Sequence, residues 1–62
     1  MTARRWTKPP KCVHGIEFER WAHDMMRRGF TAWQVASKAG TSETRVTQAY
    51  HREEARRDAE RG

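Results

Sequence analysis

The residues with the most evident binding chemistry are polar side chains between positions 42 and 51, spaced to share one face of a helix. Apolar Val46, Ala49 and Tyr50 mark the opposite, inward face. The outward residues are Ser42, Glu43, Thr44, Thr47, Gln48 and His51. Glutamine can bond an adenine edge, glutamate can accept from cytosine, and threonine can contact a base edge or a thymine methyl. We interpret this face as base-reading; the alternative is a solvated surface.

A second set of residues beside this face suits contacts with phosphate, to which arginine and helix N-termini bind well. Two of its members flank the base-reading face, and the others come from the preceding helix. The predicted phosphate-contacting residues are Thr31, Trp33, Gln34, Lys38, Arg45 and Arg52. Trp33 has a second interpretation, in which its ring completes the hydrophobic core, and we favour this second interpretation.

The N-terminal 15 residues hold four basic residues and no acid: Arg4, Arg5, Lys8 and Lys11. The Pro9-Pro10 pair blocks a helix and favours extended chain. A flexible arm of this kind can follow a phosphate backbone or enter a minor groove, although a solvated tail is the other interpretation. We expect Trp6 to fold back onto the core and to place its basic neighbours near the DNA-facing side.

The elements that position these residues are two short helices joined at Gly40. Thr31 and Gln34 have the spacing of a capping box, and Phe30 with Val35 has that of a hydrophobic staple. The first helix should therefore start after Thr31 and end at Gly40, which favours the left-handed conformation of a helix end. Ser42 is expected to cap the next helix, with Glu43 at its positive end.

A longer amphipathic helix is predicted before this pair, from Ile16 to Arg28, with Gly29 closing it. Its apolar residues recur at helical spacing: Phe18, Trp21, Ala22, Met25 and Met26. We interpret the two methionines as core filling rather than a ligand pocket.

Residues 53–62 are charged and contain no leucine, isoleucine or valine. The pairs Glu53 with Arg57 and Arg56 with Glu60 can extend the helix by i, i+4 attraction. Without a heptad seam, the segment is expected to be a solvated extension that frays, rather than a dimer contact.

Segment 30–50 resembles the helix-turn-helix superfamily, as found in Cro-like phage repressors and in the C-terminal domain of sigma factors. The resemblance rests on a small residue at the helix crossing, a glycine at the turn and apolar residues around them: Ala36, Gly40, Val35, Ala39, Val46 and Ala49. Thr41 departs from it, since many members have an apolar residue there. The resemblance implies that the helix from Ser42 onward enters the major groove. Arg5-Trp6-Thr7 also resembles the opening of Myb-like domains, which supports Trp6 as a core residue.

Composition narrows the class of protein further. A chain of 62 residues with net charge +5 is one small domain, and it buries only about 60 % of its unfolded surface. No apolar run approaches the roughly 20 residues that cross a bilayer, and no secretory signal is evident, so we expect a cytoplasmic protein without a membrane partner. The single Cys12 agrees with a reducing compartment.

Catalytic chemistry is not expected. Cys12 and His14 with His23 or His51 match no standard zinc spacing, and no phosphate loop or paired carboxylate in an apolar setting is present. The sequence thus predicts no enzyme, metal or cofactor.

The predicted architecture is an all-α, compact three-helix helix-turn-helix domain over residues 16–52, with the basic arm 1–15 and the charged extension 53–62. Its expected partner is double-stranded DNA, bound as a homodimer by a repressor or accessory factor of a phage or mobile element. The alternative is a protein-binding helix-turn-helix antagonist that docks on a transcription activator or on RNA polymerase.

Overall fold

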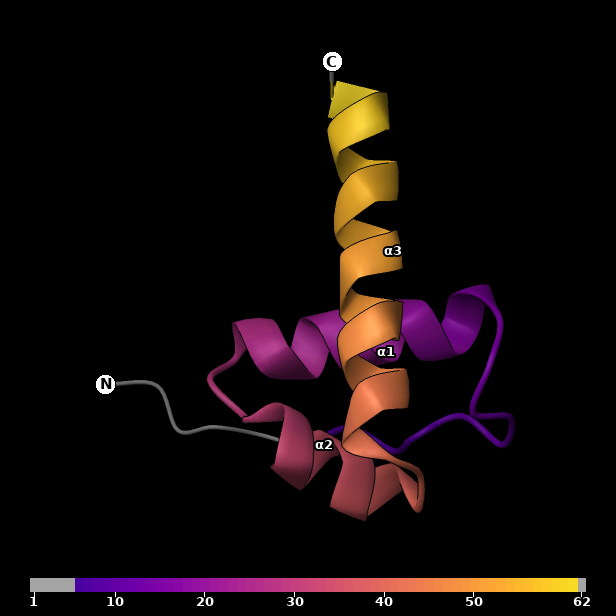
Figure 1. The fold of residues 1–62 in the computed structure, drawn as a ribbon, viewed down its shortest axis with the longest axis vertical. Helices are drawn as coiled ribbons and strands as arrows, with labels where there is room; N and C mark the ends of the chain where they lie inside the picture. The colour runs from indigo at the N-terminus through magenta and orange to yellow at the C-terminus, as the bar shows by residue number, and fades with distance from the viewer. Residues whose placement is uncertain (1–5, 62) are drawn as a thin grey trace.

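Three helices follow one another along the chain: α1 (Ile16–Arg27), α2 (Ala32–Ala39) and α3 (Glu43–Arg61). They are seen in a computed structural model that describes residues 6–61. α3 crosses α1 steeply, and α2 lies beside the first part of α3 (Figure 1). The contact between α1 and α3 is the largest between helices. The predicted all-α, three-helix fold is confirmed.

α1 ends one residue earlier than the sequence predicts. Arg28 is its C-cap, and its amide donates to the carbonyl oxygens of Asp24 and Met25. Gly29 follows with φ of 109°, a left-handed conformation that glycine adopts without steric cost. This turn directs the chain from α1 into α2.

The predicted ends of α2 are both confirmed. The Gln34 amide donates to the Thr31 hydroxyl at 3.1 Å, and the Thr31 amide donates to the Gln34 side-chain oxygen at 3.0 Å, which completes the capping box. At the other end Gly40 has φ of 74°, and the Thr41 amide donates to the Ala36 carbonyl oxygen at 2.9 Å. These two closures fix the length and direction of α2, and therefore the entry into α3.

α3 begins as predicted, but it does not become fully exposed to solvent directly after Arg52. Ser42 accepts a hydrogen bond from the Arg45 amide at 3.2 Å, and the helix then continues to Arg61. Glu53, where the solvated extension was expected to start, is only 3 % exposed. That expectation is wrong for Glu53 because α1 crosses α3 there and supplies a polar contact.

The core lies where the three helices meet. Its buried apolar residues are Phe18, Trp21, Ala22, Met25, Phe30, Val35, Ala36, Val46 and Ala49. Met26 packs against them, so the prediction that both methionines fill the core is confirmed. Trp33, in contrast, is 66 % exposed, and its interpretation as a core residue is wrong. The place beside Trp21 and Phe30 is taken by Trp6 instead.

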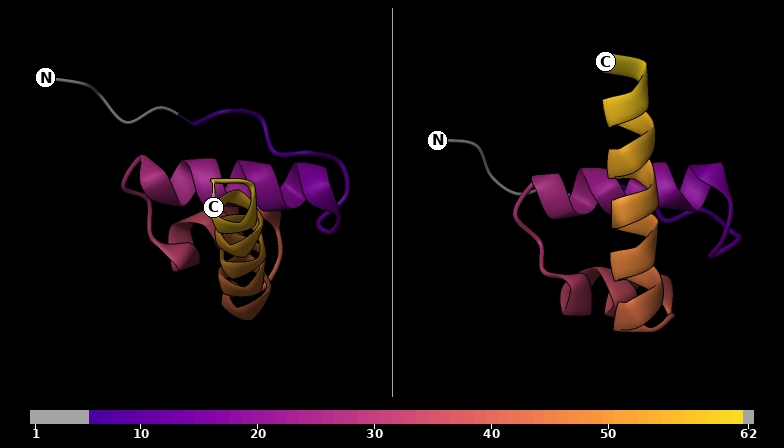
Figure 2. Two further views of the ribbon diagram at one scale, coloured as in Figure 1. Left: turned by 90° about the horizontal axis from the view of Figure 1, so that it is seen from above. Right: turned by 45° about the horizontal axis from the view of Figure 1, so that its top comes forward.

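The segment before α1 runs first along the side of α1 that faces away from α3 (Figure 2), and it then reaches α3, where His14 and Gly15 line a recess beside that helix. The Trp6 ring stacks on Phe30 with centroids 3.8 Å apart and lies 6.5 Å from the Trp21 ring. The Trp21 indole N–H donates to the Thr7 carbonyl oxygen at 3.2 Å, and Val13 packs against the core as well. The prediction that Trp6 joins the core is confirmed, and this part of the arm is anchored rather than free.

Replacing Trp6 with alanine should destabilise the domain by about 1–3 kcal/mol, since it removes apolar cover and two ring contacts. Chemical denaturation followed by far-UV circular dichroism measures the change. Trp33→Ala is the matched control, because this tryptophan is mostly exposed and its removal should cost less than about 0.5 kcal/mol. Equal losses for the two variants would contradict the anchoring role of Trp6.

Candidate nucleic-acid interface

The outer face of α3 carries the residues predicted to read bases, and none of them is buried. The exposed residues are Ser42, Glu43, Thr44, Thr47, Gln48 and His51. On the opposite side Val46 and Ala49 are buried, and Tyr50 is half-buried. The facing inferred from sequence is therefore the facing in the structure, and the outer side chains are available to a partner.

A polar cluster holds α3 on α1 where the helices cross; the sequence predicted its Glu53–Arg57 pair but not the contacts of Arg56 and Arg52 with Glu19. The Glu19 carboxylate of α1 accepts from Arg56, which also contacts Glu53. Arg57 donates to Glu53 at 2.7 Å, and Arg52 lies 3.8 Å from Glu19. Both glutamate side chains are nearly buried, at 11 % and 4 % exposed. The cluster fixes the rotation of α3 and hence the direction of its outer face.

The electrostatics of Glu53 follow from this setting. Burial by itself opposes ionisation of the Glu53 carboxyl. The hydrogen bond from Arg57 and the positive charges of Arg56, Arg57 and Arg20 outweigh burial, and together they hold its pKa below the ordinary value. Glu53 is thus a stably ionised group inside the helix crossing.

A second polar contact lies on the other side of α3. His23 of α1 is 2 % exposed, its Nε2 lies 2.5 Å from Glu54 Oε1, and its ring stacks on Tyr50 with centroids 4.7 Å apart. The hydrogen bond with His23 lowers the pKa of Glu54, with the charges of His23, Arg27 and Arg61 acting the same way against a desolvation cost. α1 therefore contacts α3 through Glu19 on one side of the crossing and through His23 on the other, and the outer face of α3 remains uncovered.

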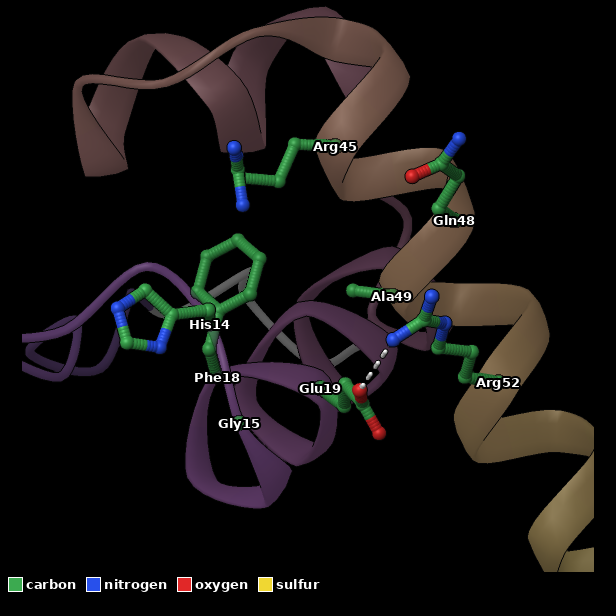
Figure 3. A pocket seen from close by; sticks show the side chains of 8 residues that line it. All are labelled: His14, Gly15, Phe18, Glu19, Arg45, Gln48, Ala49 and Arg52. Carbon is green, nitrogen blue, oxygen red and sulfur yellow. Dashed lines mark ion pairs between the residues drawn. The ribbon is translucent and has the colours of Figure 1, made fainter.

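The predicted phosphate contacts do not all lie together. Arg45 and Arg52 border one recess between α3 and the start of α1 (Figure 3). The Lys38 ammonium instead lies 5.5 Å from the centre of the Trp6 ring, near the anchored arm. Thr31 and Gln34 bond one another's backbone amides, which occupies the Thr31 hydroxyl and the Gln34 side-chain oxygen. The arginine pair is thus the part of the phosphate set that adjoins the outer face of α3.

The basic arm stays a predicted DNA contact. Lys8 and Lys11 are exposed, and Lys11 lines a hollow together with His14 and Gly15 just before α1. Arg4 and Arg5 lie outside the described residues. The expectation that the folding back of Trp6 places its basic neighbours near the DNA-facing side therefore stays a prediction.

His14 also lines the recess, and it was not among the site residues that the sequence predicted. It lines the recess together with Phe18 and Glu19, both from the first turns of α1. Its position relative to Arg45 depends on how α3 crosses α1, and no spacing along the chain reports that. Within residues 6–61, no three His, Cys, Asp or Glu side chains come together as metal ligands would, and Cys12 is exposed.

Comparison with known proteins does not assign the chain: no family model, no curated protein and no solved structure matches it. None of the helices within residues 6–61 has both the length and the apolar character needed to cross a membrane. Function is therefore inferred from the surface chemistry of α3 and its neighbours.

Proposed function

We propose that the protein is a sequence-specific regulator of transcription that binds double-stranded DNA with α3 in the major groove. The observation that carries the proposal is the outer face of α3, where hydroxyl, amide, imidazole and carboxylate groups are exposed opposite a buried face. Gln48 and Thr47 supply the hydrogen-bonding groups that distinguish bases in the major groove. Because the contacts with Glu19 and His23 of α1 hold α3 in one orientation, these groups point in a fixed direction, as base reading requires.

We further propose that the protein is a repressor or accessory factor of a phage or mobile element and that it acts in the cytoplasm. A single helical module buries roughly 600–1,000 Å² of its surface on DNA, which limits both affinity and specificity. A homodimer on an inverted repeat doubles the contact, and its two-fold symmetry is mirrored in the site. We therefore propose a homodimer on DNA.

A second candidate function has its own supporting observation, the exposed Trp33. An indole that is 66 % exposed on α2 is the kind of residue that protein interfaces bury, since tryptophan is enriched at binding hot spots. In this alternative function, the protein is an antagonist that docks on a transcription activator or on RNA polymerase. In that case the complex depends on Trp33 and not on the arginines.

The experiment that tests DNA binding is selection from a random-sequence duplex pool with the purified protein at moderate salt, followed by sequencing. We expect enrichment of one motif, with two-fold symmetry if a dimer reads it. Gln48→Ala should relax selection at one position of the motif, with a loss of about 1–3 kcal/mol in discrimination. The exposed Glu60→Gln near the end of the same helix is the control and should select the wild-type motif.

The two candidate functions can be distinguished by how the affinity of the complex depends on salt and on single residues. DNA binding predicts that replacing Arg45 and Arg52 weakens the complex and lowers its salt dependence, because each phosphate contact releases counterions. A protein complex tolerates those changes and is lost with Trp33→Ala. Absence of enrichment, or a duplex complex insensitive to salt, would exclude the DNA-binding function.

A further inference from the structure

The recess beside α3 has the chemistry of a site for an anionic group. It lies between the start of α1 and the middle of α3, and Arg45 reaches from α3 across it toward His14 and Phe18 (Figure 3). Gln48 lies at its rim and points away from it, toward the outer side of α3. The recess and the base-reading face are therefore adjacent surfaces of one helix.

The nitrogen-bearing side chains at the recess are not all used within the protein. The Arg45 guanidinium forms no ion pair with any residue between 6 and 61, and the His14 ring has no hydrogen-bond partner there. The one carboxylate on the wall, Glu19, is held by Arg56 and by Arg52. The recess thus offers exposed nitrogen groups that no described protein group pairs with, while its single carboxylate is already paired with arginines.

The size of the recess admits a small anionic group. The recess is partly open to solvent and has a volume of about 100 Å³, where a single water molecule needs only about 10–15 Å³ on the same measure, so a group of a few heavy atoms fits. The buried Phe18 lines the recess and excludes a deeper polar ligand. A tetrahedral phosphate group matches both the room and the donors, because guanidinium and phosphate form charge-assisted hydrogen bonds.

We infer that this recess seats one phosphate of the DNA backbone, bound by Arg45 and His14 with Arg52 at its edge. The inference rests on the proposed function and adds to it the contact that sets the register of α3 on the duplex. Fixing one phosphate beside Gln48 determines which base pair that side chain meets, since phosphate contacts position a protein and base contacts specify the sequence.

The test replaces phosphates of the enriched duplex one at a time by uncharged methylphosphonate and measures the dissociation constant. For the wild-type protein we expect one position per half-site where binding weakens about ten- to a hundredfold, as for loss of a charged hydrogen bond. Arg45→Gln should lose the same factor on the unmodified duplex and show no further loss at that position. Its salt slope on the random pool should fall by about one unit.

The control is Arg61→Gln, which removes another exposed arginine of α3, one that pairs with Asp58 at the helix end, far from the recess. This variant should keep the wild-type pattern of methylphosphonate sensitivity. His14→Ala should reduce the effect at the same phosphate and at no other. That result would show that Arg45 and His14 bind the same phosphate, because a general loss of positive charge would weaken binding at every phosphate.

Each other outcome overturns the inference in a distinguishable way. If the wild type binds the duplex but Arg45→Gln remains fully sensitive at every phosphate, the recess is not the seat while DNA binding stands. If the wild type binds no duplex, both proposals fail. If titration with inorganic phosphate shifts the amide resonances around His14 and Gly15 without any duplex binding, the recess takes a free phosphate and not the DNA backbone.

Discussion

Glu53→Ala should destabilise the domain by about 1–3 kcal/mol at neutral pH, because it removes the nearly buried acid that two partly exposed arginines share. The side chain is nearly buried at the crossing of α1 and α3, where it accepts from both Arg56 and Arg57. Without it, Arg57 loses its acid and Arg56 keeps only Glu19. For 62 residues, roughly 0.05–0.15 kcal/mol per residue gives a free energy of unfolding of about 3–9 kcal/mol, so this loss is a substantial part of the total.

The effect of Glu53 should also depend on pH in a defined direction. Its pKa is lower in the folded protein than the ordinary value of 4.5, so its contribution is complete above about pH 4.5. As the pH falls below 4.5, the unfolded state takes up a proton that the folded state still excludes, and the contribution is lost once the pH has fallen through the folded pKa. The difference in unfolding free energy between wild type and Glu53→Ala should therefore shrink below pH 4.5.

Urea denaturation at a series of pH values measures both effects. Glu60→Ala is the matched control, since it removes an exposed acid from the same helix and should change stability by less than about 0.5 kcal/mol. A difference between wild type and Glu53→Ala that is as large at pH 3 as at pH 7 would show that packing, and not the ionised cluster, stabilises the crossing.

The features that the sequence predicted well are those set by neighbours along the chain. The capping box at Thr31, the left-handed Gly40 and the Ser42 cap each depend on residues within a few positions, and each is present. The inward facing of Val46 and Ala49 follows from helical period alone. Local rules therefore suffice for the helix ends and for the two faces of α3.

The features that the sequence missed depend on how the helices cross. Glu19 and His23 stand four residues apart on α1, and neither belongs to the apolar pattern that predicted its buried face. They are buried because α3 brings Glu53, Arg56 and Glu54 against that side of α1. Trp33 was misassigned because it lies off the buried face of α2, which Val35 and Ala36 form, and it is 66 % exposed.

Phe18→Ala should cost about 3–5 kcal/mol, because truncating a fully buried aromatic ring removes its transfer free energy and leaves a cavity. The Phe18 ring lies 6.0 Å from that of Trp21 and also lines the recess beneath Arg45. We expect the variant to be largely unfolded at 25 °C by circular dichroism. Ile16→Ala, which truncates an apolar residue that is 54 % exposed on the same helix, should remain folded.

The same variant can show whether folding and DNA binding are coupled. A ligand that binds only the folded state stabilises it by about 2.7 kcal/mol at a hundredfold excess over its dissociation constant. Added duplex should therefore restore much of the helical signal of Phe18→Ala, and restore less when Arg45 is also replaced, because the seat for the phosphate is then incomplete. Recovery that is independent of Arg45 would indicate that the duplex stabilises the domain through the base-reading face alone.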